Sequence, residues 1–439
     1  MSNRYLQIPV SNKTSDGKMS FRKGIANLIF QIPAINSTLI PGSVRIQGSV
    51  RCYVDDAGTT PTGTKLSADE RLGVYACFQS LTTRSIKHQQ TIEQIRHYSH
   101  FLNNFLPLAT STEDAITHFS QSSLQEPNWK LYRDSVIRVF ADNHFCLPLP
   151  CGLFNGTEDI ALSENLLGGL EIVLALASDS QVLFSDDGDT TDINTAWYEF
   201  EDLHLVCEVR DYQPDELSRL MKKSSSGFTY QTISSYYDTI NTSSANVTFN
   251  LGLSKVRSVF SSFINSNYLN NYGENSYATC LPSNTDGTQA SVKKLTWTKG
   301  GALYPKHFEV NTNIRDSQDT NLQDPVVVKD YVSAVADFSN NEALQMGVVT
   351  TNRDIIMKND TTSNNLLQYT RVADGGVSYG LGIKYDALGG SGIDFSNPGS
   401  QFGMNIELDL TDNNPQSVFL FVNSEVNVVM NQNGLQVIQ

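Results

Sequence analysis

The stretch at residues 197–223 reads WYEFEDLHLVCEVRDYQPDELSRLMKK, and it divides the chain into two halves of nearly equal length. Between residues 203 and 209 apolar side chains occupy the odd positions, the alternation expected of a half-buried strand. Upstream, Tyr198 and Phe200 place their apolar side chains on even positions instead. The alternation therefore changes near Asp202, which predicts a β-bulge or a short break between two strands.

The same stretch predicts a short helix and a flexible spacer after the strand, which should end near Asp211. Pro214 suits the first position of a helix, and the acidic residues that follow it suit the first turn. Lys222 and Lys223 would then complement the negative end of the helix dipole. Because Ser224–Gly227 is typical of a linker, we expect residues 213–227 to join two domains and the helix to set the angle between them.

Length and composition indicate a globular protein of more than one domain. The 439 residues are enough for two or three domains, and 39% hydrophobic with 18% charged residues is an ordinary balance. Many Asn, Ser and Thr residues and 29 Gly favour short strands joined by loops. We find no apolar run near the roughly 18 residues that span a bilayer. The first residues lack the layout of a secretory signal, so we expect synthesis inside a cell without secretion.

Charge and cysteine content exclude some classes of function. The net charge of -15 argues against direct wrapping of nucleic acid, which needs a basic surface. The six cysteines are scattered and include no CxxC pair or other zinc spacing. We interpret Cys52 and Cys207 as small buried hydrophobic residues in strands, with disulfide partners as the alternative.

Several further elements can be predicted along the chain. Residues 1–24 are polar, and we expect them to form a loose N-terminal arm. Residues 43–54 alternate cleanly as one strand, and residues 91–106 show a helical spacing that Pro107 should end. Residues 166–177 are apolar on both faces, which predicts a strand covered on both sides.

The second half of the chain is also predicted to consist mainly of strands. Residues 247–264 predict two strands with a bend near Gly252, and Asp324 and Pro325 resemble the start of a helix. Residues 402–410 alternate as a strand, and the dipeptide Asn433–Gly434 predicts a tight hairpin near the C-terminus.

Three groups of residues are candidate binding sites, each with a simpler interpretation. Glu93, His97 and His100 would share one helix face and could chelate a divalent ion, or simply form the wet side of the helix. The acidic run SDDGDTTD at 185–192 has the carboxylate density of a calcium loop but lacks its order, so a solvated loop is favoured. The glycine-rich GGVSYGLG at 375–382 fits a strand edge or loop better than a phosphate cradle.

No enzyme motif is present in the sequence. It contains no GxSxG, Walker loop or HExxH, and its seven histidines suggest no Ser-His-Asp or Cys-His arrangement. We therefore assign no catalytic, cofactor-binding or metal-binding residues and no cofactor, and the sequence gives no positive reason to assert an enzyme.

Two strand-rich halves of about 200 residues, with occasional helices, predict an all-β protein built as two β-sandwiches in tandem. At this level the chain resembles the double jelly-roll major capsid proteins of tailless icosahedral DNA viruses, especially those of virophages and polinton-like viruses. The resemblance lies in the order of strands, loops and helices and in the composition of these segments, not in invariant motifs. It rests on the stretch quoted above and on the segments GFTYQTISSYYDTINTSSANVTFNLGLSKVRSVFSSFIN, NSNYLNNYGENSYATCLP, GGALYP and VNVVMNQNGLQVIQ.

The resemblance implies two tandem eight-stranded jelly rolls with a few short inserted helices. We expect an arm at 1–24, a first jelly roll at 25–212, a linker helix and spacer at 213–227, and a second jelly roll at 228–439. It also implies a structural protein of the virion, not an enzyme, that is assembled inside the host cell and forms homotrimers. These pseudo-hexagonal capsomers would tile an icosahedral shell.

The implied partners are neighbouring capsomers and minor capsid, penton or cement proteins, while relatives often enclose an internal membrane. Sequence-specific contact with nucleic acid is not expected. Two other classes stay open from the residues alone. One is a carbohydrate-binding tandem β-sandwich such as an attachment protein, and the other is a β-rich glycoside hydrolase, which would need two carboxylates about 5 to 10 Å apart in a cleft.

Overall fold

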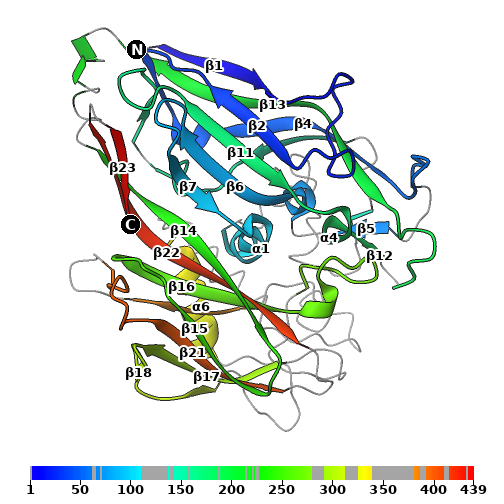
Figure 1. Cartoon of the computed structure of the whole chain (residues 1–439), viewed down its shortest axis with the longest axis vertical. Coiled ribbons are helices and arrows are strands. Elements are labelled where there is room, and N and C mark those ends of the chain that lie inside the picture. Colours follow the sequence, from blue (N-terminus) through cyan, green and yellow to red (C-terminus); the bar gives the residue numbers. More distant parts are fainter. Residues whose placement is uncertain are drawn as a thin grey trace, which may run out of the picture.

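The computed structural model shows two β-sandwiches, with the N-terminal and C-terminal halves of the chain in separate sandwiches (Figure 1). The structure describes residues 2–61, 66–69, 72–109, 137–138, 143–156, 158–185, 188–212, 215–216, 218–219, 222, 227–278, 291–311, 325–338, 380–385, 392–409, 415–431 and 434–439.

The first sandwich contains two main sheets. One sheet consists of β1 (Ser2–Pro9), β3 (Ser37–Leu39), β4 (Arg45–Tyr53), β9 (Asn143–Pro148), β10 (Ile160–Ala161) and β13 (Trp197–Asp211). The other consists of β2 (Asn27–Ile32), β6 (Phe78–Ser85), β7 (Thr91–Ile95) and β11 (Leu170–Leu176). A small third sheet combines β5 (Leu66–Ala68), β8 (Ile137–Arg138) and β12 (Leu183–Ser185). The helices among the described residues of this half are α1 (Tyr98–Ala109) and α4 (Asp179–Val182).

The second sandwich repeats this plan. One sheet consists of β14 (Phe228–Ile240), β16 (Val256–Asn265), β20 (Leu381–Lys384), β22 (Gln416–Asn431) and β23 (Gly434–Ile438). The other consists of β15 (Ser244–Phe249), β17 (Ser291–Lys299), β18 (Ala302–Leu303), β19 (Val310–Asn311) and β21 (Phe402–Asp409). The helix α6 (Pro325–Ala336) packs against β20 and β16.

Strand pairing gives each half the topology of a jelly roll. In the first half β1 pairs with β13, β2 with β11, β4 with β9, and β6 with β7, all antiparallel. In the second half β14 pairs with β22, β15 with β21, β16 with β20, and β17 with β18. Of eight main strands, the first therefore pairs with the last, the second with the seventh, the third with the sixth and the fourth with the fifth. This nested pairing is that of a hairpin wrapped into two sheets, so the predicted pair of eight-stranded jelly rolls is confirmed.

The central strand of the first roll is β13, the strand predicted from the opening stretch. Its register against β4 shifts between Glu201 and His204, and Asp202 has a φ of 53°. The predicted change of alternation is thus a β-bulge inside one strand of 15 residues. The bulge lets Tyr198 and Phe200 on one side of it and Leu203 on the other all face the core.

The N-terminal segment differs from the loose arm expected at residues 1–24. Residues 2–9 form β1 and pair with β13 over eight residue pairs, and Met19 makes a further bridge to Phe200. The expectation rested on polar composition, but an edge strand needs only alternate apolar residues on one face. Ile8 and the following Val10 supply them and are buried.

Two other predicted elements have different boundaries. Residues 91–106 are not one helix, because Thr91–Ile95 is strand β7, and α1 continues through Pro107 to Ala109. Ile92 and Ile95 are buried on β7, and their spacing also fits a helix. Strand β11 alternates buried and half-buried residues, so only one of its faces is fully covered.

Phe200 tests the role of the bulged strand. Its ring is fully buried and lies 5.9 Å from the ring of Phe78, 5.7 Å from Phe145 and 5.6 Å from Tyr198. We expect Phe200→Ala to lower the free energy of unfolding by about 3–5 kcal/mol, measured by denaturant titration. The control Tyr5→Ala removes a ring that is 73% exposed on β1 and should change it by less than about 0.5 kcal/mol. Similar losses for both variants would contradict this assignment.

Candidate functional site at the junction of the two jelly rolls

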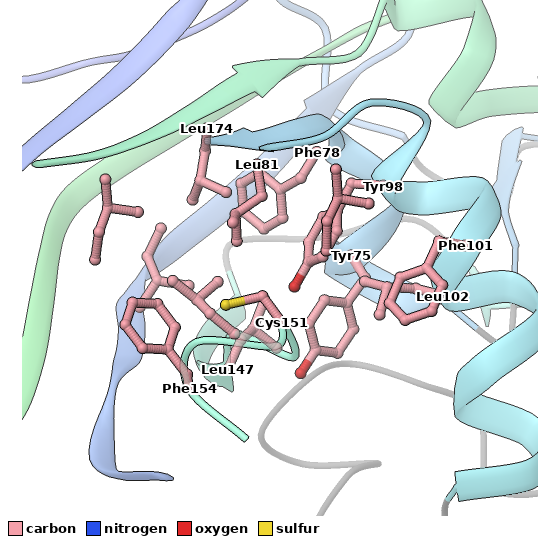
Figure 2. Close-up of a cluster of buried hydrophobic side chains, with 14 of the residues drawn as sticks. Tyr75, Phe78, Leu81, Tyr98, Phe101, Leu102, Leu147, Cys151, Phe154 and Leu174 are labelled. Atoms are coloured by element: carbon pink, nitrogen blue, oxygen red, sulfur yellow. The ribbon is translucent and has the colours of Figure 1, made fainter. Parts of the chain in front are cut away.

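The helix α1 belongs to the first roll but lies between the two rolls (Figure 1). On one side Tyr98, Phe101 and Leu102 join a cluster of buried residues of the first roll that includes Tyr75 and Phe78 (Figure 2). Residues of both rolls belong to one continuous hydrophobic core. The rolls are therefore joined by shared burial and not only by the chain connection.

On its other side α1 meets the second roll through aromatic rings and a buried amide. The ring of Phe101 lies 5.9 Å from that of Phe421 on β22 and 5.5 Å from that of Phe338 after α6. Asn104 donates from Nδ2 to Oγ of Ser262, at 3.2 Å, and accepts at Oδ1 from the hydroxyl of Tyr331, at 2.8 Å. A buried amide must satisfy both of its ends, so Asn104 makes this helix specific for its neighbours on β16 and α6.

Two histidines at the start of α1 pack against the second roll. The imidazole of His100 stacks on the ring of Phe419, at 4.0 Å between centroids, and lies 4.9 Å from Tyr277. His97, just before the helix, meets Phe419 edge-on at 5.2 Å. Burial disfavours the charged imidazole, so it lowers the pKa of His97 and lowers that of His100 to about 3. Both rings therefore serve as neutral aromatic contacts at neutral pH.

A buried carboxylate connects β7 to the second roll. Glu93 accepts hydrogen bonds from the backbone N–H groups of Gly152 and Leu153, both at 2.9 Å, and from the hydroxyl of Thr232 on β14, at 2.7 Å. Loss of hydration raises the pKa of Glu93, and the three hydrogen bonds oppose that rise. The carboxylate thus joins three segments, two from the first roll and one from the second.

The two rolls approach each other so closely at residue 152 that this position requires glycine. A Cβ atom at Gly152 would lie 1.7 Å from the backbone oxygen of Gln231 on β14, well inside van der Waals contact. Nearby, the hydroxyl of Tyr230 donates to the backbone oxygen of Ile92 at 2.8 Å. Backbone segments of the two rolls therefore touch directly beside Glu93.

A loop of the second roll forms the other half of the junction. We call residues 266–278, which follow β16, the strap. Tyr277 of the strap is fully buried, and its hydroxyl donates to the backbone oxygen of Ala76 in the first roll, at 2.9 Å. Asn103 on α1 donates to the backbone oxygen of Tyr277 at 2.9 Å, and Asn275 donates to Asp69 at 2.8 Å. The strap carries side chains of the second roll into the core of the first.

The predicted metal-binding group is dispersed by the structure. Glu93 lies on β7 and His100 on α1, so they do not share a helix face. The glutamate oxygens face backbone N–H groups and Thr232, while the imidazoles face aromatic rings. The simpler interpretation, a wet helix face, is also wrong because Glu93 and His100 are buried. Among the described residues no group of three or more His, Cys, Asp or Glu is placed to hold a metal ion.

The other two candidate loops are only partly described. Asp186 and Asp187 lie outside the described residues, and Asp189 accepts from the backbone N–H and hydroxyl of Thr191 in a local turn. Residues 375–379 also lie outside them. Gly382 is part of β20, where a Cβ would come within 2.9 Å of Ala334 on α6. That glycine permits close packing of helix on strand, in line with the strand interpretation.

The linker helix is described at five positions. Residues 215, 216, 218, 219 and 222 are helical and mostly exposed. Leu217 and Leu220, the two leucines of this segment, lie outside the described residues. Its role in setting the angle between the rolls stays a prediction, whereas α1, β7 and the strap make the contacts above. Within the described part of the chain no helix is long and apolar enough to span a membrane.

Comparisons with known proteins place the fold. No family model matches the chain, and no curated protein matches its sequence. The structure is similar to VP54 of PBCV-1, as fitted into a reconstruction of the virophage Sputnik, with a TM-score of 0.58 and 10% identity over 99% of this chain and 96% of that one. A cryo-EM structure of the Sputnik virophage gives 0.53 and 11%, over 99% and 88%. The major capsid protein of Faustovirus gives 0.51 and 9%, over 98% and 90%.

At such low identities the likeness establishes the fold and not the function. It extends over both rolls, because 98% or more of the chain is covered in each comparison. The chain therefore has the double jelly-roll fold of these viral proteins, as its resemblance to them implied.

Glu93 offers a direct test of the junction. In Glu93→Gln an amide NH₂ replaces one acceptor oxygen and faces groups that themselves donate. We expect the free energy of unfolding to fall by about 1–3 kcal/mol, measured by denaturant titration. The control Glu164→Gln changes an exposed glutamate of the same roll and should stay within about 0.5 kcal/mol of the unchanged protein. A Glu93→Gln variant as stable as the control would show that the carboxylate does not stabilise the junction.

The two histidines predict the pH dependence of stability. The unfolded imidazoles take up protons below their ordinary pKa of 6.5, whereas the buried His100 stays neutral down to about pH 3. Unfolding therefore becomes easier as the pH falls below 6.5, by up to about 1.4 kcal/mol per pH unit for each histidine. The raised pKa of Glu93 acts in the opposite direction, since protonation then favours the folded state.

His100→Phe isolates one part of this effect, because phenylalanine can stack on Phe419 and does not titrate. Unfolding free energies measured from pH 7 to pH 5 should fall less steeply for this variant than for the unchanged protein. His144→Phe, at an exposed position on β9, should leave the slope unchanged. Equal slopes for all three proteins would contradict the role assigned to His100.

Proposed function

We propose that this protein is the major capsid protein of an icosahedral DNA virus, a structural subunit without catalytic activity. The observation that carries the proposal is the double jelly roll itself, which matches viral proteins over nearly the whole length of both chains. An attachment protein or a glycoside hydrolase would need a carbohydrate-binding site or a cleft besides the fold. Two rolls with the same nested pairing and a shared core instead suit a building block.

The proposed assembly is a homotrimer with a pseudo-hexagonal outline. Three copies of a subunit with two similar rolls present six similar units around one axis, and cyclic symmetry reuses the same contacts in each copy. Such an outline requires a constant angle between the two rolls. The junction of α1, Glu93 and the strap supports that requirement, because its contacts are buried and specific.

The proposed domain division follows the strand pairing. All strands up to Asp211 pair within the first roll, and all strands from Phe228 pair within the second. We therefore assign the first roll to residues 2–212, including β1, and the second to residues 228–439, with residues 213–227 between them. Neighbouring capsomers, minor capsid, penton or cement proteins and an internal membrane are the proposed surroundings in the virion.

Electron microscopy and mass photometry of the purified protein test the proposal. We expect a population with three times the mass of the monomer, about 145 kDa from the chain mass of 48.5 kDa (3 × 48.5), and triangular or hexagonal particles that form sheets or shells when concentrated. Under the attachment-protein alternative the protein would bind glycans as a separate oligomer. A monomer under all conditions, with no capsomer and no shell, would exclude a capsid role.

A further inference from the structure

Lys384 and Asn423 lie on either side of one residue of the second roll. Strands β20 and β22 both pair with β16, and Ser258 on β16 is opposite Lys384 on one side and Asn423 on the other. Residues directly opposite each other in antiparallel strands point to the same face of the sheet. The hydroxyl of Ser258 donates to the backbone oxygen of Ala334, so this is the face on which α6 packs. The amine of Lys384 and the amide of Asn423 therefore face the helix from neighbouring positions.

The carboxylate of Asp337, the residue after α6, contacts both of these groups. Its Oδ1 lies 2.8 Å from Nζ of Lys384, and its Oδ2 accepts from Nδ2 of Asn423 at 3.0 Å. Arg257 donates to the same two oxygens, at 3.0 and 3.2 Å, and holds the carboxylate in place. The side chain of Asp337 is 2% exposed. One buried carboxylate thus holds an amine and a primary amide at its two oxygens.

The amide of Asn423 is buried but only partly satisfied. The side chain is fully buried, and its Nδ2 is held by Asp337 and by Oε1 of Gln231, at 3.2 Å. Its Oδ1 has no hydrogen-bond donor among the residues that the structure describes. A buried acceptor without a donor is costly, and reactive sites are one place where such groups occur. The amide is therefore fixed by its nitrogen, while its carbonyl oxygen can accept a proton during a reaction.

An amine, a primary amide and a carboxylate between them are the groups that form an amide bond between two side chains. A neutral amine is a nucleophile and can attack the amide carbon. A carboxylate in contact with both nitrogens can take a proton from the amine and then give it to the departing nitrogen. The burial of the amide and the carboxylate limits competition from water.

We propose that Nζ of Lys384 attacks Cγ of Asn423 and that an isopeptide bond joins the two side chains inside the second roll. The bond between Nζ and Cγ forms, and the bond between Cγ and Nδ2 breaks. One of the three ammonium protons of Lys384 stays on the new amide nitrogen. The other two pass by way of Asp337 to the departing nitrogen, which leaves as an ammonium ion. The reaction needs neither an oxidant nor a reductant.

The isopeptide bond connects β20 to β22 across β16, on the face covered by α6. A covalent link between segments distant in sequence restricts the unfolded chain and so stabilises the folded one. The bond forms within a single copy of the chain. The inference therefore goes beyond the proposed capsid role and does not depend on it.

Intact mass spectrometry of the whole chain tests the bond. The main species should be lighter than the mass calculated from its sequence by one ammonia molecule, about 17 Da. Lys384→Arg keeps a positive charge beside Asp337, but a guanidinium does not give up a proton and attack, so this variant should have its full calculated mass. Lys255→Arg is the matched control, because Lys255 also pairs with a carboxylate of this sheet, that of Glu425 on β22. This control should show the same loss of ammonia as the unchanged protein.

Peptide mapping locates the bond and distinguishes it from other losses of ammonia, such as succinimide formation at Asn-Gly pairs. Trypsin should not cut after Lys384 in the reacted protein, and one branched peptide should contain both Lys384 and Asn423. Asp337→Asn should stay unreacted over the time in which the unchanged protein converts, because an amide cannot take up the proton. A fully reacted Asp337→Asn variant would contradict the role of this carboxylate.

Two results overturn the inference. The first is an unchanged protein that keeps its full calculated mass, both as purified and after long incubation at about pH 9, where more of the amine is neutral. The second is a loss of ammonia that persists in Lys384→Arg or that maps to other residues.

Discussion

The contact on which the structure depends is the burial of α1 between the two rolls. A single jelly roll closes its own core, so nothing in its topology determines where a second roll should lie. Here Phe101 and His100 of the first roll contact aromatic rings of the second roll. Tyr277 of the second roll in turn donates a hydrogen bond to the backbone of the first. Apolar burial supplies most of the stabilisation, whereas the hydrogen bonds of Glu93 and Asn104 add direction. Apolar contacts alone would permit sliding, but a buried carboxylate with three donors has one favourable position.

Two other buried carboxylates also connect segments that are distant in sequence. In the second roll Asp337 is buried and receives Arg257, Lys384 and Asn423, and these partners hold the pKa of the carboxyl below its usual value despite the opposing effect of burial. In the first roll Glu199 receives Lys18 and Lys23 from the N-terminal segment. Each carboxylate connects segments far apart in sequence, and removing all of its cationic partners would leave an unpaired buried charge. Such charges specify which segments meet more than they add stability.

The fold class was predictable from the sequence because strand alternation is a local property. The alternation from 203 to 209 and the helix at Pro325 appear in the structure. The hairpin near the C-terminus does too, but Gly434 pairs with Asn431 as the first residue of β23 and is not in the turn, and Asn433 lies outside the described residues. The bulge at Asp202 was also visible as a change of parity. The junction was not predictable, because it depends on which distant segments pack together. Glu93, His97 and His100 suggested a metal site when only their spacing was known. Their true partners, Thr232 and Phe419, lie more than a hundred residues away.

Acidity places a constraint on any assembly of this chain. Copies that each carry a net charge of -15 repel one another, so contacts between them must use surfaces where the local charge is low or reversed. The sequence contains two such regions on opposite edges of one sheet of the second roll. Residues 239–254, around the edge strand β15, contain no charged residue, and residues 292–307, around β17 and β18, contain only positive ones. Lys294 pairs with Glu309 and Glu407, and Lys306 pairs with Asp330, so the second edge carries less net charge than its sequence suggests. In the proposed capsomer both edges can therefore approach a neighbour with little repulsion. A change of ionic strength should therefore have only a small effect on a contact made at either edge, since there is little net charge to screen.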